Sequence, residues 1–111
     1  PFKKKQSYFA MTAHVIYRSI DKLNTATHSK KIINLIRSKI GFKNILISDD
    51  LSMKSLKDDL KTNTIKTFSA GCNIALHCNG KMSEMKVVGD NSPKVSNFII
   101  KKTSLFYKIL S

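Results

Sequence analysis

A short apolar run that ends in two adjacent carboxylates constrains the fold of this chain more than any other feature. The run comprises residues 45–48, of which the first three are apolar and the last is Ser48, and Asp49 and Asp50 follow directly. A run without polar alternation is typical of a strand buried on both faces, as in a parallel sheet. Ligands bind at the carboxyl ends of such strands in open α/β sheets and in α/β barrels. Because the chain has only seven acidic residues, we expect at least one of this pair to be functional.

Two further strand-like runs, at residues 9–15 and 73–78, precede and follow this one. Between the first two runs, apolar residues recur at helical spacing over residues 29–40, and Gly41 follows as a C-terminal glycine. Residues 51–70 predict one or two short helices. The chain therefore alternates strands and helices, which favours βα units.

The helices around the third strand have weaker boundaries. We expect Asn63 to break the helical segment before this strand. Residues 81–88 are weakly helical, and Ser92 with Pro93 predicts the start of a last helix, as its N-cap and first residue.

The order β-α-β-α-β-α with right-handed crossovers predicts a parallel sheet covered by helices. Such a sheet is either half of a doubly wound fold or a sector of a (β/α)8 barrel. A complete barrel takes ~250 residues, so a barrel formed by 111 residues is partial. We expect residues 1–111 to be one domain or part of one, and the first residue, Pro1, suggests a chain cut from a longer one.

The net charge of +13 invites a nucleic-acid interpretation, which the residue types do not favour. All but two of the 20 basic residues are lysine, the exceptions being Arg18 and Arg37. Base reading and bidentate phosphate contacts favour arginine. The lysines are also spread along the chain. No run is apolar enough to predict a membrane span or a secretory signal.

The two cysteines, Cys72 and Cys78, lie in or beside the third apolar run, and we expect two buried, reduced thiols. The sequence has no paired Cys-x-x-Cys and no histidine pair at ligand spacing, so we expect neither a zinc site nor a cofactor.

The two carboxylates are predicted to differ in direction. Side chains alternate along a strand, so Asp49 shares the face of Ile45 and Ile47 and points into the mouth of the site. Asp50 turns aside, where it suits the N-cap of the next helix. A purely structural capping role for both acids is the alternative.

Four other residues are candidates for the site or its support. His14 ends the first strand and is either a hydrogen-bonded structural histidine or a residue that lines the substrate pocket. Met53 follows the acid pair and either packs or contacts substrate. His77, inside the third strand, is interpreted as a core or supporting residue. Glu84, the only glutamate, is interpreted as a solvated charge.

Three groups of residues occur in order along the chain: Ala10–Tyr17, then Ile40–Phe42 with Ser48–Met53, then Ala70–Asn73 with Leu76–Gly80. In this order they resemble the sixth, seventh and eighth βα units of bacterial β-N-acetylhexosaminidases of glycoside hydrolase family 3. The resemblance covers nearly the whole chain. It implies a partial (β/α)8 TIM barrel that holds the last three βα units, without the N-terminal units that complete it.

The same resemblance implies a cytoplasmic, retaining exo-enzyme. Its substrate would be terminal, non-reducing β-linked N-acetylglucosamine on muropeptides, released during peptidoglycan recycling, with Asp49 as nucleophile and Asp50 in support. The family's acid/base signature, a Lys-His pair followed by a Gly-rich stretch with a histidine, is absent from this sequence. Because this signature is absent, we expect little activity from these 111 residues alone. From the residue types and the short apolar runs, we expect neither nucleic acid nor a membrane as a partner.

A receiver-like phospho-signalling domain is the alternative from another class. Such domains also end a buried strand in paired acids, which bind Mg²⁺. They need a further aspartate at the end of a later strand, where this chain has Cys78, Asn79 and Gly80.

Overall fold

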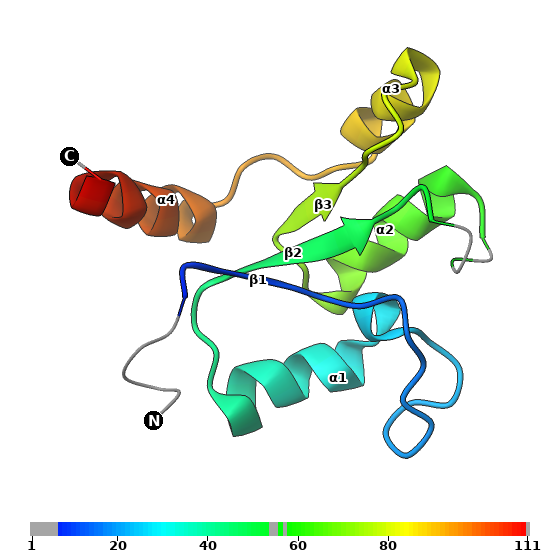
Figure 1. The fold of residues 1–111 in the computed structure, drawn as a ribbon, viewed down its shortest axis with the longest axis horizontal. Coiled ribbons are helices and arrows are strands. Elements are labelled where there is room, and N and C mark those ends of the chain that lie inside the picture. The colour runs from blue at the N-terminus through cyan, green and yellow to red at the C-terminus, as the bar shows by residue number, and fades with distance from the viewer. Residues whose placement is uncertain (1–6, 54–55, 57, 111) are drawn as a thin grey trace.

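The computed structural model describes residues 7–53, 56 and 58–110, without the side chain of residue 109. Its centre is a sheet of three parallel strands, β1 (Phe9–Met11), β2 (Ile45–Asp50) and β3 (Ile74–Leu76), in the spatial order β1-β2-β3 (Figure 1). The predicted parallel arrangement is confirmed.

The outer strands are shorter than predicted. The amide of Thr12 still donates to the Ile47 carbonyl, at 2.8 Å. Beyond it, the carbonyls of Ala13 and Val15 accept from the amides of Thr27 and Ala26. The first strand therefore leaves the sheet because its backbone pairs with its own downstream loop.

The pairing of β2 with β3 is irregular where the acids lie. Ile47 pairs with Ile74 and Asp50 with Leu76, so three steps on β2 match two on β3. A bulge of this kind redirects side chains and is common beside functional sites. The simple alternation expected from Ile45 to Asp50 is interrupted at this point.

The first helix follows the sequence pattern closely. Ser29 accepts a hydrogen bond from the Ile32 amide and caps α1 (Lys30–Leu35). The helix continues as a π-helical turn, Ile36–Ile40, and ends at Gly41, whose φ of 78° is the left-handed conformation expected of a terminal glycine.

Two of the predicted boundaries in the later helices are wrong. Helix α2 (Leu60–Ala70) runs through Asn63, whose side-chain amide donates to the Asp58 carbonyl at 2.9 Å instead of breaking the helix. The cap of α2 is Asp59, not Asp50, since the Asp59 carboxylate accepts from the Thr62 amide at 2.7 Å.

The last helix starts later than Ser92 and Pro93. Ser92 donates to the Val88 carbonyl at the end of α3 (Met82–Asp90). Ser96 accepts from the Ile99 amide, so it caps α4 (Asn97–Leu110).

Helices α1 and α2 pack on one face of the sheet. The core between them is formed by side chains from α1, β2, α2 and the adjoining turns, namely Ile33, Phe42, Leu46, Ala70 and Cys72. Helix α3 lies beyond the carboxyl end of β3, and α4 lies at the opposite end (Figure 1). There Phe106 packs edge-on against Tyr8 and Phe9, with ring centroids 5.2 and 5.5 Å apart.

The opposite face of the sheet carries exposed apolar side chains. Met11 is 57% exposed and Phe9 36%, although both belong to β1. None of the described helices combines the length and the apolar content that a bilayer span requires.

Candidate active site

The acids, His14 and the turn after β3 meet at the carboxyl edge of the sheet. The His14 ring lies 2.8 Å from the Asp50 carbonyl, measured from Nε2. The amide of Cys78 donates to Asp50 Oδ1 at 3.0 Å. Parallel strands place their carboxyl ends together, so residues from three distant parts of the sequence share one edge.

The carboxylate of Asp50 is hydrogen-bonded to the turn after β2 and to the turn after β3. Besides the Cys78 amide, it accepts from the Ser52 amide at 3.0 Å and from the Ser52 hydroxyl at 2.7 Å. Burial alone would raise the pKa of Asp50, but these hydrogen bonds hold it below its ordinary value. Asp50 therefore organises the turn after β2 and ties it to β3, rather than capping α2.

The carboxylate of Asp49 is less engaged. Within the described residues, Oδ1 accepts one hydrogen bond, from the neighbouring Asp50 amide at 2.8 Å. The side chain is neither fully buried nor fully exposed. Of the two acids, Asp49 keeps more of its oxygen lone pairs available to an incoming group.

Both ring nitrogens of His14 are occupied, and the residue is only 8% exposed. A carbonyl can only accept, so Nε2 carries a proton and donates to Asp50. Nδ1 lies 2.8 Å from the Thr27 hydroxyl, which donates to the Ala13 carbonyl at 3.1 Å and lies 2.9 Å from the Thr12 hydroxyl. This geometry gives His14 the structural role, and its contact with substrate stays a prediction.

Met53 lies in the turn after the acids and is 42% exposed. Its amide donates to the Asp50 carbonyl at 3.2 Å, which closes the turn. That bond uses only the backbone, and the side chain is partly exposed to solvent. Its role in substrate binding stays a prediction.

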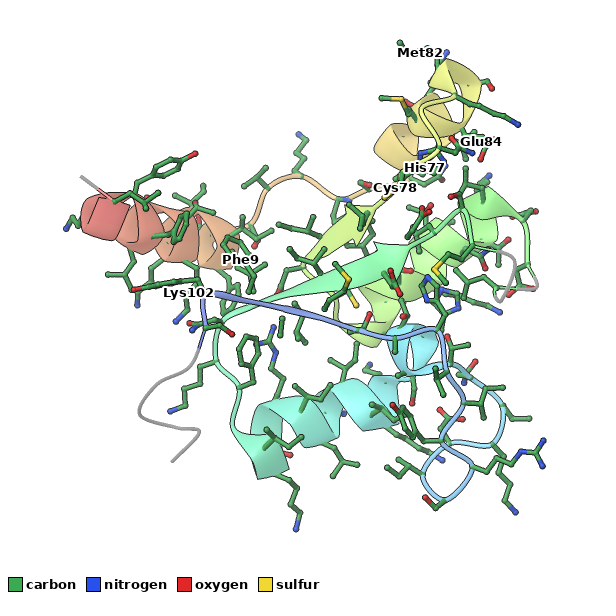
Figure 2. The ribbon with its side chains drawn as sticks, in the orientation of Figure 1. Phe9, His77, Cys78, Met82, Glu84 and Lys102 are labelled. Carbon is green, nitrogen blue, oxygen red and sulfur yellow. The ribbon has the colours of Figure 1, made fainter. Side chains whose placement is uncertain are left out.

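The interpretation of Glu84 as a solvated charge is wrong. Its carboxylate accepts from His77 Nε2 at 3.2 Å and from the Asn79 side-chain amide at 2.8 Å. Figure 2 shows His77 and Glu84 together where β3 leads into α3. The spacing of seven residues crosses a turn, so no helical or strand periodicity signals this pair.

The two thiols differ in environment. Cys72 is buried as predicted, whereas Cys78 is exposed in the turn after β3. Burial raises the pKa of the Cys72 thiol to about 11. Across the described part of the chain, no three histidine, cysteine or acidic side chains converge in a way that could hold a metal ion.

A parallel sheet with helices packed on one face and acids at its carboxyl edge is the architecture of an α/β enzyme domain. The family model for the N-terminal domain of glycosyl hydrolase family 3 matches residues 4–102. The chain belongs to this family, as its sequence motifs predicted, and the receiver-like and nucleic-acid alternatives are not favoured.

Individual relatives agree with this assignment. A β-hexosaminidase of Mannheimia succiniciproducens is 38% identical over 71 residues, covering 62% of this chain and 20% of the relative. The β-N-acetylglucosaminidase from Thermotoga maritima gives a TM-score of 0.67 at 28% identity, over 96% of this chain and 26% of that one. The β-N-acetylhexosaminidase from Beutenbergia cavernae gives 0.68 at 25% identity, over 76% and 26%.

The chain spans only part of these proteins. It covers from 20% to 28% of the length of eight curated β-hexosaminidases to which it is similar.

Proposed function

We propose that residues 1–111 form the last three βα units of a single (β/α)8 catalytic barrel, with β1, β2 and β3 as its sixth to eighth strands. The parallel order and the helices on one face support this placement. So does the exposed side chain of Met11, since the further strands of a closed barrel would bring side chains against that face.

The reaction we assign to the complete barrel is hydrolysis of terminal, non-reducing β-linked N-acetylglucosamine. The family match and the names of the relatives support a hexosaminide substrate. The motif resemblance extends this to muropeptides, and hence to peptidoglycan recycling in the cytoplasm.

Asp49 is the nucleophile in this proposal. The observation that carries it is the contrast between two neighbouring carboxylates at the carboxyl end of β2. Asp50 accepts three hydrogen bonds from Ser52 and Cys78, whereas Asp49 accepts one within the described residues. A nucleophile needs an available lone pair, and the neighbouring acid supplies the rigid turn that holds it.

The chemistry follows that of retaining glycosidases. An Asp49 oxygen attacks the anomeric carbon and forms a covalent glycosyl-enzyme as the aglycone leaves, and water then releases the sugar with retained configuration. A second group must protonate the leaving oxygen. The resemblance assigns that role to a histidine outside these 111 residues, so His14, with both nitrogens engaged, is not its substitute.

The test compares Asp49→Asn with Asp50→Asn in the full natural protein that contains this chain, using an aryl β-N-acetylglucosaminide. Asp49→Asn should lower kcat by about five orders of magnitude, on the order of 7 kcal/mol. Asp50→Asn should cost less, because its role is positional. A slow fluorinated substrate should leave the sugar attached to Asp49.

Both acids fall in the tryptic peptide 44–54, so the attachment must be located by fragmentation of that peptide. A sugar on Asp50, or a greater loss from Asp50→Asn, would move the nucleophile to Asp50. Residues 1–111 alone should show almost no turnover, and hydrolysis at ordinary enzymatic rates would contradict the proposal that the acid/base lies elsewhere.

A further inference from the structure

The turn between β3 and α3 is tied together by one carboxylate. Glu84, in the first turn of α3, accepts from His77 at the end of β3 and from Asn79 in the turn itself. The Asn79 side chain in turn accepts from the Lys81 amide at 3.0 Å. Gly80 has a φ of 74°, which lets the backbone reverse between these anchors. Residues 77–81 are therefore held at both ends and in the middle.

The His77 ring is almost fully enclosed, which makes this contact more than a surface ion pair. Its side chain is 5% exposed, and Nδ1 is buried with no hydrogen-bond partner among the described residues. An ionised carboxylate can only accept, so Nε2 donates to Glu84 and the contact is a directional hydrogen bond to a carboxylate.

The direction of the pKa shift of Glu84 agrees with a charged carboxylate that accepts hydrogen bonds from the turn. Hydrogen bonds from His77 and Asn79 hold the pKa of Glu84 below its ordinary value. The Lys81 ammonium lies 3.8 Å away, although it is 71% exposed and contributes little. Glu84 also sits in the first turn of α3, where a negative charge is stabilised.

The turn held by Glu84 supplies a hydrogen bond to the acid pair. Cys78 lies between the two residues that Glu84 binds, and its amide donates to Asp50 Oδ1. We propose that Glu84 is a positioning residue of the active site, holding the turn through His77 and Asn79 so that the Cys78 amide keeps donating to Asp50. This inference rests on the proposed function, because it assigns the role of the turn to the same acid pair.

The consequence for catalysis is geometric. Within the described residues, Glu84 makes its hydrogen bonds with His77 and Asn79 and none with Asp49 or Asp50, so it acts only through the turn. Loss of the Cys78 hydrogen bond would loosen the turn that aims the neighbouring Asp49. A displacement of about 1 Å at a reacting group costs on the order of 100-fold in rate.

The test uses Glu84→Ala and Glu84→Gln in the full natural protein, with Asp90→Ala as a control for losing an exposed acid from the same helix. Amide hydrogen exchange at Cys78 should become at least about tenfold faster in Glu84→Ala. Glu84→Gln should restore most of the protection, because its carbonyl oxygen can accept from both His77 and Asn79. Asp90→Ala should leave exchange at Cys78 unchanged.

Kinetics supply the second measurement. Glu84→Ala should lower kcat by ~10- to 100-fold with little change in KM, since Glu84 does not touch substrate. Glu84→Gln should recover most of the rate. If Glu84→Ala does not fold, Asn79→Ala removes the partner instead of the carboxylate and should change both measurements in the same direction.

Unchanged exchange at Cys78 in a folded Glu84→Ala variant would overturn the proposal whatever the activity. Faster exchange with normal kcat would overturn the catalytic relevance of the turn. If the unaltered protein hydrolyses no hexosaminide, the proposed function fails, while exchange at Cys78 still decides whether Glu84 holds the turn.

Discussion

The imidazole of His14 donates to the backbone carbonyl of Asp50 across a distance of 2.8 Å. This bond joins the segment after β1 to the carboxyl end of β2, at the point where the backbone pairing of those strands has already ended. The second acid is therefore fixed through both of its polar ends, its carbonyl by His14 and its carboxylate by Ser52 and Cys78. The acid pair is held by contacts from all three strand ends.

Replacement of His14 should destabilise this edge of the sheet. His14→Ala removes one hydrogen-bond partner from the Asp50 carbonyl, which keeps the Met53 amide, and one from the Thr27 hydroxyl, which keeps Thr12 and the Ala13 carbonyl. The loss of both contacts should lower the free energy of unfolding by about 1–3 kcal/mol. Thr27→Val keeps the shape but removes the hydroxyl and should cost less. Urea unfolding followed by circular dichroism measures both. Equal stability of His14→Ala and the unaltered protein would contradict this role.

Asp21 should make stability depend on acid pH. Hydrogen bonds from Ser29 and from the Leu23 amide lower the pKa of Asp21 to about 2. A lowered pKa in the folded state stabilises the fold above the unfolded value of 3.8, and this contribution is lost as pH falls toward 2. The Tm advantage over Asp21→Asn should therefore shrink between pH 5 and pH 2.5. Parallel Tm curves for the two proteins would show that the carboxylate does not contribute in this way.

The two thiols should react at very different rates. Cys72 is buried and its pKa is raised to about 11, whereas Cys78 is exposed. Iodoacetamide near pH 8 should modify Cys78 at least on the order of 100-fold faster, since the thiolate is the reactive form. Both lie in the tryptic peptide 67–81, so fragmentation must assign the label. In urea the rates should converge, and similar rates in the folded protein would mean that Cys72 is not enclosed.

Gly71 and Gly80 offer a matched pair of glycine substitutions. Both have positive φ, 121° and 74°. A Cβ on Gly71 would lie 2.9 Å from Ile33 Cγ2, whereas a Cβ on Gly80 has nothing within 4 Å. Gly80→Ala should cost about 1–2 kcal/mol from backbone conformation alone. Gly71→Ala should cost more, about 2–4 kcal/mol, because it also overpacks the core. Denaturant unfolding of both variants gives the comparison, and the reverse order would contradict it.

The sequence by itself determined the alternation of strands and helices and the position of the acids. An apolar run, a helix cap at Ser29 and a terminal glycine at Gly41 are local signals, and local backbone preferences decide their outcome. Parallel pairing follows because helices connect the strands, and it places Asp49 and Asp50 at the edge where His14, just after β1, also lies.

The tertiary structure alone decided how individual polar groups are used. Asn63 stays inside α2 because the Asp58 carbonyl is within reach, and Glu84 is bound because the turn after β3 returns His77 to it. The bulge between Ile47 and Asp50 depends on how β3 pairs with β2. These partners are separated by turns and by pairing register, and neither the period of a helix nor that of a strand records contacts across them.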